Sequence, residues 1–166
     1  MEVREAAPHE YVQAGRVTAD AYREFVRPGD EGWERYLARI ADVADRADRT
    51  TILVAVEDGR FLGSLTLELD GRVRDENDDE FRPLEPEEAH IRMLGVDPAA
   101  RARGVARALM AESEERAGAA GKTFVTLHTT QRMKAARAMY ERLGYERTDD
   151  IVFPDGFVLL GYSKRL

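Results

Sequence analysis

Three arginines and one glycine lie close together where an apolar segment gives way to a predicted helix. The stretch VDPAARARGVARALM, residues 96–110, places Arg101, Arg103 and Arg107 around Gly104. The first turn of a helix presents unpaired backbone N–H groups and partial positive charge, so a phosphate can bind there. A glycine permits close backbone approach, and the arginines add charged donors. The alternative is an ordinary turn glycine beside a solvated charged face, and the pattern alone does not decide between the two.

The basic stretch belongs to a chain that is acidic as a whole. The chain has 25 Lys and Arg against 32 Asp and Glu, which gives a formal net charge of −7 at pH 7. A general nucleic-acid-binding surface is therefore not expected, and any anion site must be local. The absence of cysteine excludes disulfides, thiolate metal sites and cysteine nucleophiles. No group of His, Asp and Glu residues has metal-ligand spacing, so we expect no metal.

The length and the 43% of hydrophobic residues are typical of one globular domain, here residues 1–166. The first residues, MEVREAAPHEYVQ, lack the apolar core of a signal peptide. No apolar run reaches the roughly 18 residues of a membrane span. We therefore expect a soluble, cytoplasmic protein that does not contact a membrane.

Hydrophobic periodicity predicts a mixed α/β domain with the element order βααβββαβαββ. A short strand at 2–6 precedes two amphipathic helices. Their apolar positions are Ala14, Val17, Ala21 and Phe25 in the first helix and Trp33, Leu37, Ile40 and Ala44 in the second. The apolar runs within 51–70 flank Asp58 and Gly59, a pair that tolerates positive φ and therefore predicts a hairpin turn.

The second half of the chain predicts strands at 89–96 and 124–130, each followed by a helix. The first of these helices has the inward positions Ala102, Val105, Ala106, Leu109 and Met110 and ends near Gly118 and Gly121. The second, at 132–143, has the buried positions Ala136, Met139, Tyr140 and Leu143, with Gly144 as its cap. Residues 145–153 and 157–166 predict a final hairpin across Pro154, Asp155 and Gly156.

The segment LGVDPAARARGVARALM resembles the acyl-CoA signature of the GNAT superfamily of N-acyltransferases. In that signature Arg or Gln, two residues, Gly, one residue, and Gly or Ala open the central helix, and Arg101, Gly104 and Ala106 match it. The element order and the motif MYERLGY, residues 139–145, match as well, so the resemblance covers nearly the whole chain. It implies a mixed sheet with splayed central strands, and acetyl-CoA as cosubstrate.

The resemblance also implies which residues bind the cofactor. The backbone of Leu94, Gly95 and Val96 would pair with the pantetheine arm like an added strand, and a glycine in a strand often marks a bulge or a close backbone approach. The following loop would hold the CoA pyrophosphate through Arg101, Ala102, Arg103, Gly104, Val105, Ala106 and Arg107. Met133 stands where many members have an asparagine that contacts the cofactor.

Transfer of an acyl group to an amine needs a base, because a lysine-type amine with a pKa of about 10.4 is protonated at neutral pH. The first candidate is His90, at a strand position where members of the family often have glutamate. Imidazole, with an ordinary pKa of about 6.5, suits this role. The alternative is a structural histidine, and Glu88 is a second candidate base. His128, on the next strand, faces either the gap between the strands or the core.

The reaction also needs an acid, because collapse of the oxyanion intermediate releases a thiolate. Tyr140 resembles the tyrosine of the second motif, which lies near the thioester sulfur in many members. Tyr140 also lies on the buried face of its predicted helix, so the alternative is a core aromatic whose hydroxyl finds a polar partner.

Residues 71–88 contain a dense acidic run, formed by Asp75, Glu76, Asp78, Asp79 and Glu80. Such a run would attract a cationic amine, but charge runs are more often solvated surface loops, which is the interpretation preferred here.

The sequence is therefore interpreted as an N-acetyltransferase that moves an acetyl group directly from acetyl-CoA to a primary amine of a small molecule or peptide. The rival interpretation is a non-catalytic acyl-CoA-binding regulatory domain. His90 in place of glutamate and Met133 in place of asparagine keep this rival open, whereas Tyr140 argues against it. The identity of the acceptor and the choice between a monomer and a homodimer stay open.

Overall fold

The computed structural model describes residues 1–27, 29, 31–70 and 83–166, and the acidic run at 75–80 lies outside them. The strands are β1 (Glu2–Glu5), β2 (Thr51–Glu57), β3 (Arg60–Glu68), β4 (Glu88–Val96), β5 (Phe124–Thr130), β6 (Glu146–Arg147), β7 (Ile151–Val152) and β8 (Val158–Arg165). The helices are α1 (Tyr11–Tyr22), α2 (Glu31–Ala41), α3 (Val105–Ala119) and α4 (Lys134–Arg142).

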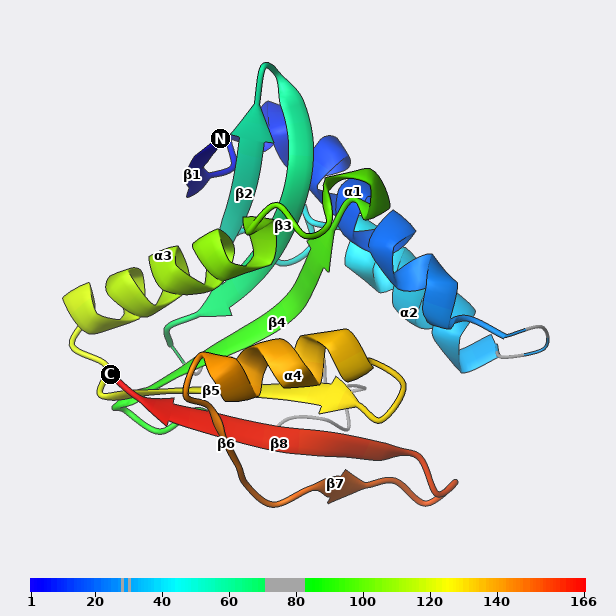
Figure 1. The fold of residues 1–166 in the computed structure, drawn as a ribbon, viewed down its shortest axis with the longest axis vertical. Coiled ribbons are helices and arrows are strands. Elements are labelled where there is room, and N and C mark those ends of the chain that lie inside the picture. Colours follow the sequence, from blue (N-terminus) through cyan, green and yellow to red (C-terminus); the bar gives the residue numbers. More distant parts are fainter. Residues whose placement is uncertain (28, 30, 71–82) are drawn as a thin grey trace.

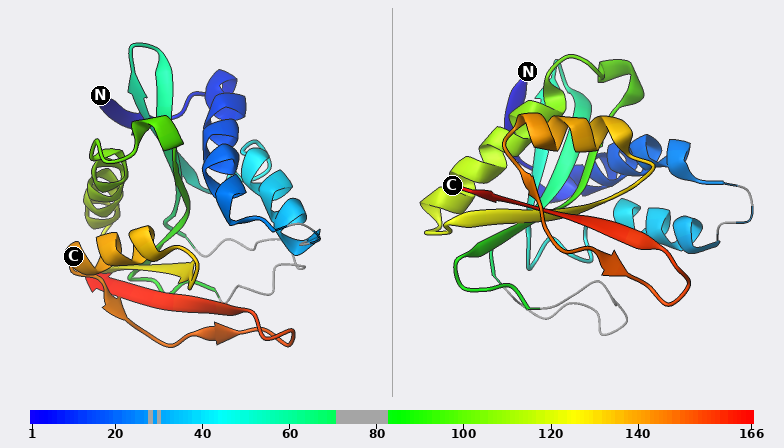
Figure 2. Two further views of the ribbon diagram at one scale, coloured as in Figure 1. Left: turned by 45° about the vertical axis from the view of Figure 1, so that its right-hand side comes forward. Right: turned by 60° about the horizontal axis from the view of Figure 1, so that its bottom comes forward.

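The strands form one sheet in the order β1-β2-β3-β4-β5-β8-β6, and β7 also pairs with β8 (Figure 1). Every pair is antiparallel except β4–β5. A parallel pair needs a crossover connection, which α3 supplies. Helices α1 and α2 lie against one face of the sheet and α3 and α4 against the other (Figure 2). The predicted mixed α/β architecture is confirmed.

The main hydrophobic core lies between the sheet and the pair α3 and α4. Leu65 of β3, Leu109 of α3 and Leu127 of β5 are almost completely buried in it. A second cluster, which includes Ala14 of α1 and Val54 of β2, attaches α1 to the opposite face. Complete burial of a leucine-sized side chain contributes about 2 kcal/mol, so these contacts fix both helical layers on the sheet.

The two central strands separate partway along their length. The parallel pairing of β4 with β5 runs from Glu88 opposite Phe124 to Ile91 opposite Leu127, and each strand continues beyond that point. Met93 has a φ of +52°, and the register of β4 against β3 shifts beside it. This bulge bends β4 away from β5, and Figure 1 shows the two strands diverging. The splayed central strands that the resemblance implied are present.

Two predicted hairpins form. Asp58 and Gly59 both have positive φ, 51° and 75°, which is the geometry of a tight two-residue turn between β2 and β3. The final hairpin also forms, but its first strand is divided into β6 and β7. The backbone N–H of Thr148 still donates to Gly161 O at 3.0 Å, yet the register against β8 slips by one residue before β7 begins. The bulge at 148–150 explains the additional strand in the element order.

Two positions predicted on inward helix faces are exposed, and a third, Phe25, lies beyond the end of α1 in the 3-10 turn Arg23–Phe25. Ala44 lies beyond the end of α2 and is exposed, because the chain turns after Ala41 and the side chain of Arg46 folds back to donate to the Arg39 and Ile40 carbonyls. Ala102 is exposed and precedes α3, in a loop conformation with a φ of +60°.

Candidate active site

The loop between β4 and α3 is shaped by two residues in the left-handed region. Asp97 begins it, and its side chain accepts a hydrogen bond from the Ala99 backbone N–H at 2.8 Å. Ala102 follows with a φ of +60° and Gly104 with a φ of +83°. Glycine adopts this conformation without the strain of a side chain, so Gly104 allows the chain to turn directly into α3 at Val105.

The start of α3 has the geometry of an anion site. The first hydrogen bond of the helix runs from Ala108 N–H to Gly104 O at 2.9 Å. The N–H groups of Val105, Ala106 and Arg107 lie before it and therefore have no acceptor within the helix. A Cβ placed on Gly104 would have one heavy atom within 4 Å, Nη2 of Arg107 at 3.8 Å. The amides and this guanidinium therefore border open space, which fits the CoA pyrophosphate that the resemblance places here.

The other two arginines of the loop contact carboxylates. Arg101 donates two hydrogen bonds to Glu24, just after α1, at 2.9 and 2.8 Å. Arg103 forms an ion pair with Glu57 at the end of β2. Both guanidiniums are half-exposed, and for Arg107 no ion pair occurs among the described residues. The positive charge expected around Gly104 is thus partly neutralised in this conformation.

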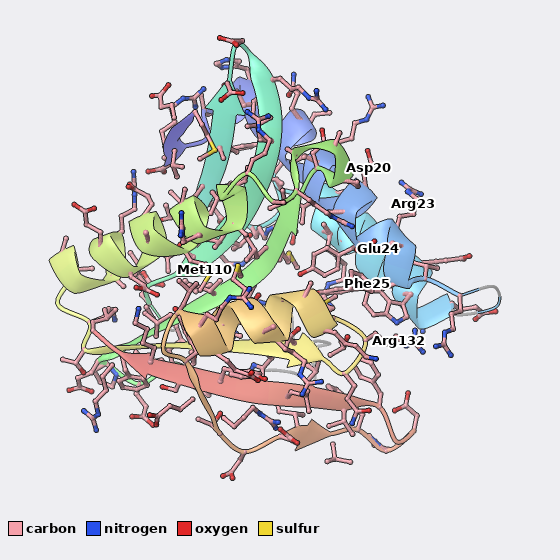
Figure 3. All side chains as sticks on the ribbon, in the orientation of Figure 1. Asp20, Arg23, Glu24, Phe25, Met110 and Arg132 are labelled. Carbon is pink, nitrogen blue, oxygen red and sulfur yellow. The ribbon has the colours of Figure 1, made fainter. Side chains whose placement is uncertain are left out.

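The turn after α1 contacts both sides of the splayed strands. Glu24 holds it to the β4–α3 loop, and the Phe25 carbonyl accepts a hydrogen bond from Arg132 at 3.1 Å in the connection from β5 to α4. Figure 3 labels Glu24, Phe25 and Arg132 on the side of the molecule that carries α1 and α2. The turn therefore bridges the two segments that border the splay.

The resemblance assigns the pantetheine arm to the last residues of β4. Leu94, Gly95 and Val96 lie beyond the last described pairing with β5, while β4 remains paired with β3. A Cβ on Gly95 would lie 2.7 Å from Cα of Thr18, so the glycine is required by the close approach of α1. The close approach at Gly95 is therefore made by α1, and pairing of this strand edge with pantetheine stays a prediction.

A cavity of about 880 Å³ lies on the α1 and α2 side of the sheet. It is lined from α1 and α2, from β4 and β5, and from the hairpin between β7 and β8. The lining residues are Tyr22, Gly32, Trp33, Arg35, Tyr36, Arg39, His90, Ile91, Arg92, Met93, His128, Thr129, Thr130, Arg132, Met133, Phe153, Asp155, Gly156, Phe157 and Leu159. Its size suits a small molecule or the end of a peptide.

Both strand histidines line this cavity. The ring centroids of His90 and His128 are 5.3 Å apart, so His128 faces the gap between the strands and not the core. Nδ1 of His90 lies 2.7 Å from Oγ1 of Thr126, and this hydroxyl donates to Oε1 of Glu88 at 2.6 Å. Glu88 is 1% exposed and does not line the cavity. The two candidate bases thus belong to one hydrogen-bonded chain, and only His90 lies at the cavity wall.

Tyr140, the candidate acid, is buried on α4 between the rings of Tyr145 and Tyr162, with both centroids 6.0 Å away. Burial raises the pKa of the Tyr140 hydroxyl well above its usual value, and the proximity of Tyr36 on α2 raises it further. The hydroxyl is therefore protonated at neutral pH, and Tyr140 belongs to the hydrophobic core and does not line the cavity.

Met133 precedes α4 and is buried at the cavity wall. Its sulfur accepts a hydrogen bond from the Thr129 hydroxyl at 3.4 Å. A thioether has no N–H donor, so Met133 cannot reproduce the amide contact of an asparagine.

Sequence reasoning missed Thr126 and the aromatic wall of the cavity. The wall contains Tyr22, Trp33 and Tyr36, whose rings contact one another at centroid distances of 5.8 to 6.5 Å. The spacing of Trp33 and Tyr36 on one predicted helix was a usable signal. Thr126 had no such signal, because only the parallel pairing opposite His90 gives it a role.

In the described residues, no three His, Asp or Glu side chains lie close enough together to hold a metal ion. The same part of the chain has no helix with the length and apolar character needed to cross a bilayer.

The splayed sheet, the start of α3 and the cavity beside β4 and β5 fit an acyl-CoA-dependent N-acyltransferase. The chain belongs to the acetyltransferase (GNAT) family, whose model matches residues 17–145. It is an N-acetyltransferase, and family membership favours the enzyme over the non-catalytic binding domain.

Relatives in sequence and structure agree with this assignment. The uncharacterized N-acetyltransferase YhfO of Bacillus subtilis is 30% identical over 142 residues, which cover 79% of this chain and 80% of YhfO. The PaiA N-acetyltransferase of Thermoplasma acidophilum, solved with coenzyme A, superposes with a TM-score of 0.73 at 13% identity, covering 99% of this chain and 98% of that one. YncA of Salmonella typhimurium, a putative acetyltransferase solved with acetyl-CoA, gives 0.67 at 19% identity and covers 99% and 93%. The two structures support the fold, and they show that members of this fold bind CoA and acetyl-CoA.

Proposed function

We propose that this protein transfers the acetyl group of acetyl-CoA directly to a primary amine of a small molecule or peptide, with His90 as the base and Tyr140 as the acid. The observation that carries this proposal is the position of His90, whose ring lines the cavity on the strand that leads into the β4–α3 loop. One strand therefore connects the proposed acceptor cavity to the proposed anion site.

When bound, acetyl-CoA supplies the activated thioester. In the proposed arrangement the amides from Ala102 to Arg107 bind its pyrophosphate, and the edge of β4 at Leu94–Val96 orients its pantetheine arm. His90 accepts a proton from the acceptor ammonium, which frees the nitrogen lone pair for attack. The Tyr140 hydroxyl donates a proton to the departing thiolate. No residue of the chain needs to form a covalent bond with the acetyl group.

The walls of the cavity indicate what kind of acceptor it favours. Tyr22, Trp33 and Tyr36 line one side, and Phe153 and Phe157, whose centroids are 5.7 Å apart, line the hairpin side. Aromatic rings on both sides favour an acceptor with an apolar or flat body next to its amine.

The test is thiol release from acetyl-CoA with a panel of polyamines, aminoglycosides, amino acids and peptide N-termini, alongside calorimetry of CoA binding. Release with one class of amine supports catalysis and identifies the acceptor. If His90 is the base, the acid limb of the pH–rate profile disappears in His90→Gln, and a limb that persists in this variant argues against the assignment. Tight CoA binding without release by any amine would count against turnover.

A further inference from the structure

A carboxylate, a hydroxyl and an imidazole form a continuous hydrogen-bonded chain across β4 and β5. In the parallel register, His90 lies opposite Thr126, and Glu88 lies two residues earlier on the same face of β4. The Thr126 oxygen is 2.7 Å from His90 Nδ1 and 2.6 Å from Glu88 Oε1. Glu88 and His90 are 1% and 6% exposed, and Thr126 between them is half-buried.

The donors and acceptors along this hydrogen-bonded chain determine which His90 nitrogen is protonated. A carboxylate has no proton to donate, so the single hydroxyl proton of Thr126 must be donated to Glu88. The Thr126 oxygen can then only accept a hydrogen bond from His90, which requires a proton on Nδ1. In the neutral ring, Nε2 is therefore the nitrogen with the lone pair, and it is the atom that can take a proton.

A second contact of Glu88 supports this direction of the chain. Its other oxygen, Oε2, accepts the backbone N–H of Glu85 at 3.1 Å. These two contacts of the carboxylate both come from donors, which favours its ionised form. A protonated Glu88 would donate to Thr126, and Thr126 would then donate to His90, which places the lone pair on Nδ1. The position of the His90 proton therefore shows in which direction the hydrogen bonds run.

The geometry points to Thr126 and Glu88 as positioning residues that hold His90 in its base-competent tautomer. This inference rests on the proposed function, in which His90 is the base. When the acceptor ammonium loses a proton, its N–H bond breaks and an Nε2–H bond forms, giving an imidazolium. Nδ1 keeps its proton, Thr126 keeps donating to Glu88, and the carboxylate charge stabilises the cation through the hydroxyl. No proton leaves Thr126 or Glu88.

This arrangement gives Glu88 a different role from that of a second candidate base. Its two oxygens are engaged by Thr126 and Glu85, and it does not line the cavity. His90 lies between Glu88 and the cavity, so the carboxylate acts through Thr126 and not on the acceptor.

The test compares Thr126→Val, which is nearly isosteric but has no hydroxyl, with Thr126→Ser, which keeps it. Thr51→Val on β2 is the control for the same change in a strand that does not line the cavity. Nitrogen NMR of the histidine rings, with His90 assigned by its loss in His90→Gln, reports the tautomer without any need for activity. We expect the Nδ1–H form in the wild type, in Thr126→Ser and in Thr51→Val, and loss of this preference in Thr126→Val.

The kinetic prediction is that kcat falls about tenfold or more in Thr126→Val while KM for acetyl-CoA changes less than about twofold, with recovery in Thr126→Ser. Thr126→Ala serves as the second removal variant if Thr126→Val does not fold. An Nε2–H tautomer in the wild type, or an unchanged tautomer in both removal variants, overturns the inference. Absence of thiol release by the wild type would instead overturn the proposed function. The NMR measurement of the tautomer would still test the hydrogen bonds from Glu88 through Thr126 to His90.

Discussion

The guanidinium of Arg101 and the carboxylate of Glu24 form a two-hydrogen-bond ion pair, at 2.9 and 2.8 Å, between the β4–α3 loop and the turn after α1. Arg101 is the arginine that the GNAT signature assigns to the CoA loop. In this conformation its donors are directed at a carboxylate of the protein itself. A phosphate of CoA and Glu24 would therefore compete for the same guanidinium.

The competition predicts that Glu24→Gln strengthens CoA binding. Both partners are about 45% exposed, and exposed ion pairs are worth at most about 1 kcal/mol, so the expected gain in affinity is about two- to fivefold. Calorimetry of CoA at low salt measures it. Glu115→Gln on the exposed side of α3 removes the same charge without touching Arg101 and should leave the affinity unchanged. Weaker binding in Glu24→Gln would mean that Glu24 supports the loop and does not compete with CoA.

Gly104→Glu should abolish CoA binding. The substitution adds a carboxylate beside the amides that precede the α3 ladder and strains a residue whose φ is +83°. We expect an affinity loss of at least about 100-fold by calorimetry. The matched control is Gly121→Glu, since Gly121 has a φ of +79°, has open space around it and lies just beyond the other end of α3. Equal loss of binding in both variants would indicate general unfolding, and unchanged affinity in Gly104→Glu would move the pyrophosphate site away from this loop.

Tyr140→Phe should lower kcat while leaving the affinity for CoA unchanged, because only the proton donor is removed. General acid catalysis contributes about 100-fold or more, which sets the expected decrease in thiol release. Tyr145→Phe is the control, since Tyr145 is also buried in the same ring cluster but its hydroxyl donates to Glu114 at 3.0 Å. Wild-type turnover in Tyr140→Phe would leave this tyrosine with a packing role alone.

The elements of the fold could be predicted because each depends on a local pattern. The hairpin at Asp58 and Gly59, for instance, follows from two adjacent residues that tolerate positive φ. The bulge at Met93 could not be predicted in this way, because an L-residue with positive φ in the middle of a strand is imposed by tertiary packing. The divided strand before β8 is a similar case, since nothing in the local pattern of 145–153 shows where its register slips.

The same distinction between local patterns and long-range contacts applies to the candidate site. The anion loop was predictable because Arg101 and Gly104 lie within one short motif. Alternation along a strand also places Glu88 and His90 on one face, so their proximity was implicit in the sequence. Thr126 is 36 residues from His90 and Glu24 is 77 residues from Arg101, so these contacts arise only when the chain is folded.

Arg46→Met should destabilise the protein by about 2 to 4 kcal/mol. The buried guanidinium donates to the carbonyls of Arg39, Ile40 and Asp42 at the end of α2, and to the Thr66 hydroxyl. Burial lowers the pKa of Arg46 to about 10, so the group remains charged at neutral pH. Removing it leaves several buried acceptors unsatisfied. Urea unfolding measures the loss, and Arg49→Met, which breaks more exposed ion pairs to Asp45 and Asp48, should cost less than about 1 kcal/mol. Similar losses in the two variants would contradict a special role for Arg46.

Glu10→Gln should destabilise the protein at neutral pH, and the difference from the wild type should vanish in acid. Glu10 accepts two hydrogen bonds from Arg4, both at 2.7 Å, and one from the Ala7 N–H at 2.8 Å. The hydrogen bonds from Arg4, followed by the one from Ala7, lower the pKa of Glu10 to about 2. An unfolded glutamate has a pKa of about 4.3. Because the folded value is lower, the stabilisation is complete above about pH 5 and is lost as the pH falls towards about 2.

Urea unfolding of the wild type and Glu10→Gln across this pH range measures the effect. The expected difference is less than about 1 kcal/mol at neutral pH, because the pair lies near the surface. Glu2→Gln is the control, since Glu2 is 70% exposed and lies 3.8 Å from the same arginine. A difference between wild type and Glu10→Gln that stays constant down to about pH 2 would show that the amide–carboxylate exchange acts through packing and not through the charge of Glu10.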